Sequence, residues 1–110
     1  MKEKGKIKKK EKDFTVPTNI TFDNEGSEIH TIIEIETRDR LGLLYDLAKT
    51  LSDNYISISS AIIATFGEQA VDTFYVKDLF GLKLHSLSKR EKLENKLKEA
   101  IQAGTLIDPY

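Results

Sequence analysis

The segment Arg38–Leu44 (RDRLGLL) combines the residue types that could bind a small polar ligand. An amphipathic helix is expected to begin at Gly42, and the first backbone N–H groups of a helix have no partner within it and carry partial positive charge. Because Gly42 has no side chain, a carboxylate could approach the N–H groups of Leu43 and Leu44 directly. Asp39 could cap the helix or bind a ligand's ammonium group. This arrangement suits a free α-amino acid, whereas the alternative is that Gly42 only supplies unusual dihedral angles at a turn.

Residues typical of catalysis or metal binding are not arranged for either role in this sequence. His30 and His85 are the only histidines, and neither belongs to a metal-ligand spacing such as HExxH. Cysteine is absent, and the glycines stand singly, so thiolate chemistry and a phosphate-binding loop are both excluded. An acylphosphatase-like site would need an asparagine near an arginine on an anion-binding loop, and none is placed beside Arg40. We therefore expect no enzymatic activity, no metal and no cofactor.

Charge is distributed unevenly along the 110 residues, whose formal net charge is −1. Seven lysines and two glutamates occupy residues 1–12, so we interpret residues 1–13 as a basic flexible arm or linker and residues 14–110 as one domain. The rest of the chain is acidic, which disfavours binding to nucleic acid. No apolar run has the length of a membrane span, and no signal peptide is recognisable. We expect a cytoplasmic protein without membrane contact.

Hydrophobic periodicity predicts four strands and two helices. The strands are rich in β-branched residues and cover residues 18–22, 30–37, 56–66 and 70–78, the last two joined by a hairpin turn at 67–69. Leucines at helical spacing predict a helix over 42–53. A second helix is expected to open on a capping box at Ser88 and Glu91 and to end near Gly104. Residues 79–84 could extend a strand or form a loop.

The order of these elements predicts an α+β, ferredoxin-like fold in which two helices cover one face of an antiparallel sheet. A fourth strand must complete the sheet, and residues 18–22 or 105–108 could supply it. We favour 18–22, because that run is longer and Pro109 truncates the other. The strand over 56–66 is apolar at both parities, with Ile56, Ile58 and Ile62 on one side and Ala61 and Ile63 on the other. Such a strand suggests that a second copy covers the open face.

Two motifs carry a resemblance to a known family. Residues 39–51 read DRxGLLxxLxxxL, and residues 74–81 read FYVKDLFG. Together they resemble an ACT domain, a regulatory module that binds amino acids, usually as a dimer. More narrowly, residues 18–102 are similar to the last ACT domain of the bifunctional uridylyltransferase/uridylyl-removing enzymes, which modify the PII nitrogen-signalling protein and respond to glutamine. The chain would then be part of a larger nucleotidyltransferase and hydrolase.

The resemblance implies an amino-acid site at a homodimer interface formed through the sheet, with glutamine as the expected ligand and PII as a partner of the whole enzyme. One side would consist of Asp39, Arg40, Leu41, Gly42, Leu43 and Leu44, and the facing strand of the partner copy would contribute Ser59, Ser60, Ala61 and Ile62. Binding would regulate the enzyme allosterically. Leu41 stands where the family usually has proline, and Ser59 and Ile62 stand where related sequences often have histidine. These differences favour the alternative, a dimerisation and docking module without a ligand.

Overall fold

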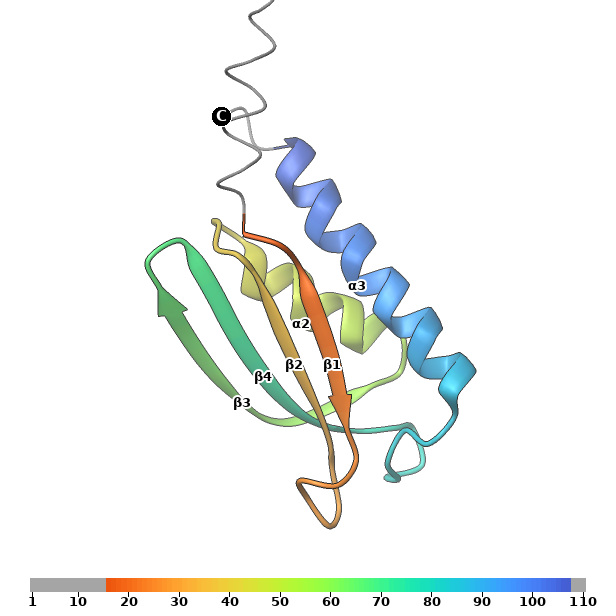
Figure 1. Ribbon diagram of the computed structural model, residues 1–110. Helices are drawn as coiled ribbons and strands as arrows, with labels where there is room; N and C mark the ends of the chain where they lie inside the picture. Colours follow the sequence, from red (N-terminus) through yellow and green to blue (C-terminus); the bar gives the residue numbers. More distant parts are fainter. Residues whose placement is uncertain (1–15, 108–110) are drawn as a thin grey trace, which may run out of the picture.

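The computed structural model describes residues 16–107 as a four-stranded antiparallel sheet with two helices (Figure 1). The strand order is β1-β2-β4-β3. In chain order the elements are β1 (Asn19–Asp23), β2 (Thr31–Arg38), α2 (Leu43–Asp53), β3 (Ser57–Phe66), β4 (Gln69–Lys77) and α3 (Leu87–Ile107). The predicted basic arm, residues 1–13, lies outside the described residues, as do residues 108–110. The predicted α+β, ferredoxin-like architecture is confirmed.

The early strand supplies the fourth member of the sheet, as predicted. β1 pairs antiparallel with β2, and Phe22 lies opposite Ile33, which in turn lies opposite Phe74 of β4. Thr18 extends this contact just before β1, because its hydroxyl shares a hydrogen bond of 2.7 Å with that of Thr37. The alternative strand at 105–108 is wrong for residues 105–107, which continue α3.

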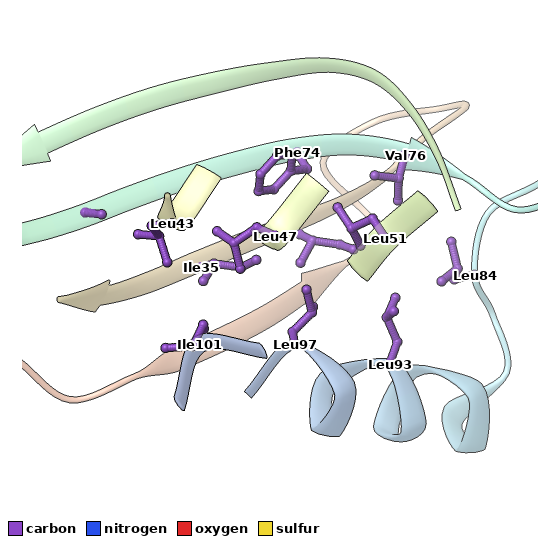
Figure 2. Packing of buried hydrophobic residues seen from close by; sticks show 12 residues of the cluster. Ile35, Leu43, Leu47, Leu51, Phe74, Val76, Leu84, Leu93, Leu97 and Ile101 are labelled. Atoms are coloured by element: carbon purple, nitrogen blue, oxygen red, sulfur yellow. The ribbon is translucent and has the colours of Figure 1, made fainter. Parts of the chain in front are cut away.

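Both helices lie on the same face of the sheet and bury one apolar stripe each (Figures 1 and 2). Alternate residues of β2 and β4 point toward them, so the strands show a strict alternation of buried and half-buried positions. The core therefore takes its members from the sheet, from α2 and from α3. They are Ile33, Ile35, Ala70, Phe74 and Val76 of the sheet; Leu43, Leu47 and Leu51 of α2; and Leu93, Leu97 and Ile101 of α3, joined by Leu84 of the loop before α3.

The start of α3 differs from the sequence-based prediction. The helix begins at Leu87, and the side-chain oxygen of Ser86 accepts a hydrogen bond of 3.3 Å from the Lys89 N–H. Ser86, not Ser88, is thus the capping residue, and the predicted box of Ser88 and Glu91 is wrong. Sequence spacing alone did not distinguish two serines that lie two positions apart.

The end of α3 also differs. Gly104 was expected to stop the helix, but the helix continues through it to Ile107. The glycine has a packing role instead, because a Cβ atom at this position would overlap the guanidinium of Arg40. Residues 79–84, for which a strand or a loop was expected, form a loop between β4 and α3.

A β-bulge in β3 changes which residues share a face. Ile58 lies opposite Val76, but the next pair joins Ser60 to Tyr75, so Ser59 has no partner in the ladder. Ile58 and Ile63 consequently lie on the helix-covered face, and Ile62 lies on the other. The grouping of Ile58 with Ile62, predicted from simple alternation, is wrong. The strand is still apolar on both faces.

Candidate functional site

A depression of about 410 Å³ lies where the turn after β2 enters α2, between the first turn of that helix and the sheet. Residues 39–45 form one wall. Ile63 and Thr65 of β3 and Asp72 of β4 form the other. The structure therefore brings together the predicted residues Asp39, Arg40, Leu41, Gly42, Leu43 and Leu44.

Gly42 is the N-cap of α2 and has φ 80° and ψ 0°, a left-handed conformation that favours glycine. No side chain caps the helix, so capping, one of the two roles considered for Asp39, is wrong. The Leu43 N–H donates to the Arg40 carbonyl at 3.2 Å, and the Asp46 N–H donates to the Gly42 carbonyl at 3.0 Å. Among the described residues, the N–H groups of the two positions between them, 44 and 45, have no acceptor. Two donors at the positive end of the helix thus border the depression.

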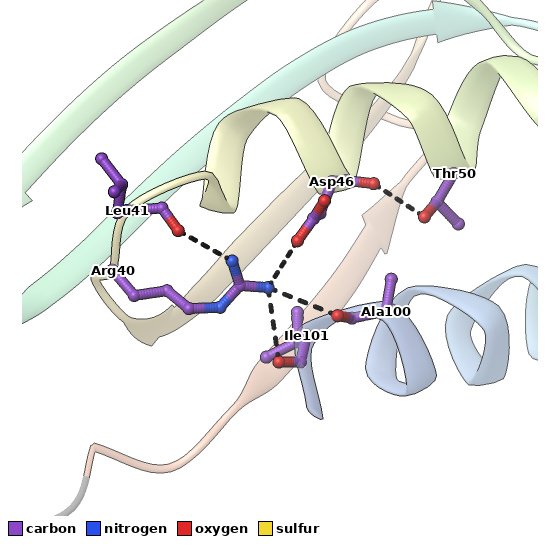
Figure 3. A network of polar contacts seen from close by, with 6 residues as sticks. All are labelled: Arg40, Leu41, Asp46, Thr50, Ala100 and Ile101. Carbon is purple, nitrogen blue, oxygen red and sulfur yellow. Dashed lines mark hydrogen bonds and ion pairs between the residues drawn. The ribbon is translucent and has the colours of Figure 1, made fainter. Parts of the chain in front are cut away.

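Arg40 borders the depression but directs its charge toward the two helices (Figure 3). Its side chain is only 11% exposed, and Nη2 lies 2.8 Å from the Asp46 carboxylate. The same nitrogen donates to the carbonyl oxygens of Ala100 at 3.3 Å and Ile101 at 3.4 Å, and Nη1 donates to that of Leu41 at 3.1 Å. Because carbonyls near a helix C-terminus attract a cation, Arg40 joins the start of α2 to the last turns of α3.

The sequence did not predict four of the residues that border the depression, namely Tyr45, Ile63, Thr65 and Asp72, and of these only Asp72 is buried and acidic. It lies between Ile35 and Ile63 on the helix-covered face of the sheet and is 2% exposed. Its Oδ1 atom is buried without a hydrogen-bond partner in the described part of the chain. Burial raises the pKa of the Asp72 carboxyl, the Ala64 backbone amide partly offsets this, and the charge of Asp39 adds to the increase. The alternation of β4 could have revealed it, because Asp72 shares its parity with the core residue Phe74.

The second predicted group lies elsewhere in the same chain. Ser59, Ser60, Ala61 and Ile62 are exposed on β3, which is an edge strand of the sheet, and none of them borders the depression. They were expected to act from a partner copy. Ile62 and Phe66 on this edge strand are 58% and 65% exposed.

Residues 16–107 contain neither a candidate metal site nor a helix suited to span a membrane. No group of three or more histidine, aspartate or glutamate side chains could hold a metal ion there. His30 packs edge-on against Tyr75, with ring centroids 6.1 Å apart. In the same range, neither helix is long and apolar enough to cross a membrane.

Comparison with known proteins identifies a family and a set of relatives. The profile of the ACR9-like, ACT-like domain matches residues 19–107. The chain is 62% identical over 104 residues to a bifunctional uridylyltransferase/uridylyl-removing enzyme of Ruegeria pomeroyi, covering 94% of this chain and 12% of the relative. Enzymes of the same name from Cereibacter sphaeroides and Azospirillum brasilense are 61% and 48% identical, over 94% and 80% of this chain and 11% and 9% of their own lengths. The chain thus spans about a tenth of these relatives. No solved structure matches it.

Proposed function

The chain belongs to the ACT-like domain family, and on that premise we propose that it binds a free α-amino acid, glutamine being the expected one, at the depression beside Gly42. It matches a segment of bifunctional uridylyltransferase/uridylyl-removing enzymes. Binding would regulate such an enzyme in its action on the PII nitrogen-signalling protein. In this proposal the ACT-like segment senses the ligand and the catalytic groups lie in other parts of the enzyme.

The observation that carries this proposal is the uncapped N-terminus of α2. Two backbone N–H groups, at Leu44 and Tyr45, have no acceptor among the described residues, and Gly42 leaves them without a shielding side chain. An α-carboxylate supplies two acceptor oxygens of the charge that a helix N-terminus favours. The carboxylates of Asp39 and Asp72 in the same depression suit the ammonium group of the same molecule.

A second copy of the domain would complete the site. β3 is an edge strand whose outer side has no partner in residues 16–107, and it exposes Ile62 and Phe66. Exposed apolar edge strands are typical of surfaces that pair with another chain. In the proposed homodimer, Ser59, Ser60, Ala61 and Ile62 of one copy face the turn Asp39–Leu44 of the other.

Isothermal titration calorimetry with glutamine tests the proposal. We expect saturable binding, lost in Gly42→Val, because valine at a φ of 80° distorts the turn and places a side chain over the N–H donors. Gly81→Val is the matched control, since Gly81 has φ 79° but lies outside the depression. Both variants carry the same backbone strain, so only a loss specific to Gly42 supports the site. Absence of heat at millimolar glutamine with folded protein would refute it.

A docking module without a ligand is the second candidate, and Leu41 favours it. This leucine is 99% exposed at the tip of the turn, where it could insert into a neighbouring protein surface. Light scattering separates the two candidates. A dimer whose mass and thermal stability are unchanged by every amino acid tried, and which dissociates in Leu41→Ser, supports docking alone.

A further inference from the structure

We propose that Asp72 is the group of this depression that binds a ligand's ammonium, and that it therefore makes the site selective for amino acids over the corresponding acids that lack the amino group. This inference rests on the proposed function, because it assigns a residue to the second charge of the same ligand.

The first argument is an unpaired buried oxygen. A carboxylate buried in an apolar setting is costly unless hydrogen-bond donors surround it, and Oδ1 of Asp72 has none among the described residues. Its neighbours in the ladder, Ile35 and Ile63, have no donor in their side chains, and the Ala64 backbone amide only partly compensates the burial of the carboxyl. A primary ammonium group carries three donors and a positive charge, which is the complement of this site.

The charges around Asp72 leave it available for a ligand. Asp39, Arg40 and Tyr45 are the other ionisable residues that border the depression. Arg40 is paired with Asp46 and with the carbonyls of α3, so its charge is engaged elsewhere. No described ion pair involves Asp39 or Asp72. Two carboxylates without an ion-pair partner in one depression favour a cation beside them.

Burial distinguishes Asp72 from Asp39. Asp39 is exposed on the turn, where water screens its charge and an ion pair contributes little. Asp72 is 2% exposed, and an ion pair with a hydrogen bond strengthens in a medium of lower dielectric constant. We therefore assign the main ammonium contact to Asp72 and a weaker, longer-range contribution to Asp39.

The arrangement places the two ends of a ligand on different elements. The N–H groups at the start of α2 receive the carboxylate, and β4 supplies the acceptor for the ammonium. A molecule that has only one of these groups can bind to only one of the two elements. Because ammonium binding requires ionised Asp72, whose pKa burial raises, ligand affinity decreases as the solution is acidified.

The test compares glutamine with 4-carbamoylbutanoate, which is glutamine without its amino group, by calorimetry on wild-type protein and on Asp72→Asn and Asp39→Asn. Loss of a charge-assisted contact predicts that Asp72→Asn binds glutamine about 10- to 100-fold more weakly. Asp39→Asn should lose less than about 3-fold. Wild-type protein should prefer glutamine, and Asp72→Asn should lose that preference. A merely structural role would weaken both ligands equally.

The outcomes separate this inference from the proposed function. If wild-type protein binds glutamine and its des-amino analogue with equal affinity, the inference is wrong and the carboxylate site at α2 stands. If glutamine does not bind, carboxyl ¹³C shifts of Asp72 are followed with methylammonium and with tetramethylammonium, which cannot donate hydrogen bonds. A saturable shift with methylammonium alone supports Asp72 as an ammonium site even then, and no shift with either overturns it.

Discussion

Buried polar groups lie near both ends of strand β2, but only those at its beginning have all their hydrogen-bond partners within the domain. At its beginning, the Thr31 hydroxyl donates to Asn24 Oδ1 at 2.5 Å and accepts from the Leu84 N–H at 2.8 Å, while Asn24 Nδ2 donates to the Leu84 carbonyl at 3.0 Å. This closed ring of hydrogen bonds joins the turn after β1 to the loop before α3. Toward the other end of β2, Asp72 Oδ1 and the N–H groups of Leu44 and Tyr45 have no partner in the described chain.

The difference indicates which end stabilises the fold and which end can accept a ligand. A buried polar group with its partners contributes to stability, whereas one without them costs free energy until something binds it. The end at Thr31 is complete within the domain. The end at Asp72 is complete only with a further molecule, which is the pattern expected of a binding site.

The largest expected effect on stability is that of Thr31→Val, at the end of β2 that carries the closed ring of hydrogen bonds. Valine keeps the shape of the fully buried threonine but leaves the Leu84 N–H and Asn24 Oδ1 without a partner. We expect a loss of about 2–4 kcal/mol in the free energy of unfolding, measured by urea denaturation. Ligand affinity should be unchanged, because Thr31 lies at the opposite end of the strand.

Thr37→Val is the matched control for this change. Thr37 is also buried on β2, but its hydroxyl has one described partner, the half-buried hydroxyl of Thr18. We expect a loss of about 1 kcal/mol. Equal losses in the two variants would contradict the importance assigned to the closed ring.

A smaller effect is expected at Arg40, whose structural contacts lie beside the depression at the other end of β2. Arg40→Met should lower the free energy of unfolding by about 1–3 kcal/mol, because the variant loses the contacts with Asp46 and the α3 carbonyls. Gly104 reports on the same contact. Gly104→Ala should destabilise the wild type, whose guanidinium occupies that space, yet stabilise Arg40→Met by about 0.5–1 kcal/mol through helix propensity.

Denaturation of the two single variants and the double variant measures this coupling. The change of sign at Gly104 is the decisive result. Additive effects would mean that Arg40 does not occupy the space above the glycine. An unchanged affinity for glutamine in Arg40→Met would further separate this contact from the ligand site, although the two lie on the same turn.

The fold followed from the sequence where local patterns and packing agree. Alternation in 30–37 and leucine spacing in 42–53 each matched one buried face, so the strand and helix were predicted nearly to their ends. Residues 18–22 were correctly placed in the sheet because the C-terminal run was too short to compete.

The remaining features depend on contacts that no local pattern carries. The bulge at Ser59 occurs within a run of serines, and these small polar residues do not indicate which face of the sheet each position occupies. Gly104 was predicted to end the helix, because Arg40, whose guanidinium leaves no room for a side chain at this position, is distant in sequence. Asp72 was not predicted as a site residue, because a charged residue on a strand is usually exposed. Most of the turn at the site was predicted, and its buried acid was not.

The smallest expected effect is the contribution of Asp72 to the pH dependence of stability. Because the pKa of folded Asp72 is above its usual value of 3.8, the native state binds more protons than the unfolded state between these two values, so this carboxyl lowers stability as pH rises through that interval. Asp72→Asn removes the titration. Its stability relative to wild type should therefore increase from pH 4 toward neutrality and then remain constant, as measured by urea denaturation without ligand. Saturating glutamine should reduce this advantage at neutral pH, because the ammonium group then pairs with the wild-type carboxylate. A difference that is independent of pH would mean that Asp72 is already solvated or paired, and the contrast between the two ends of β2 would not hold.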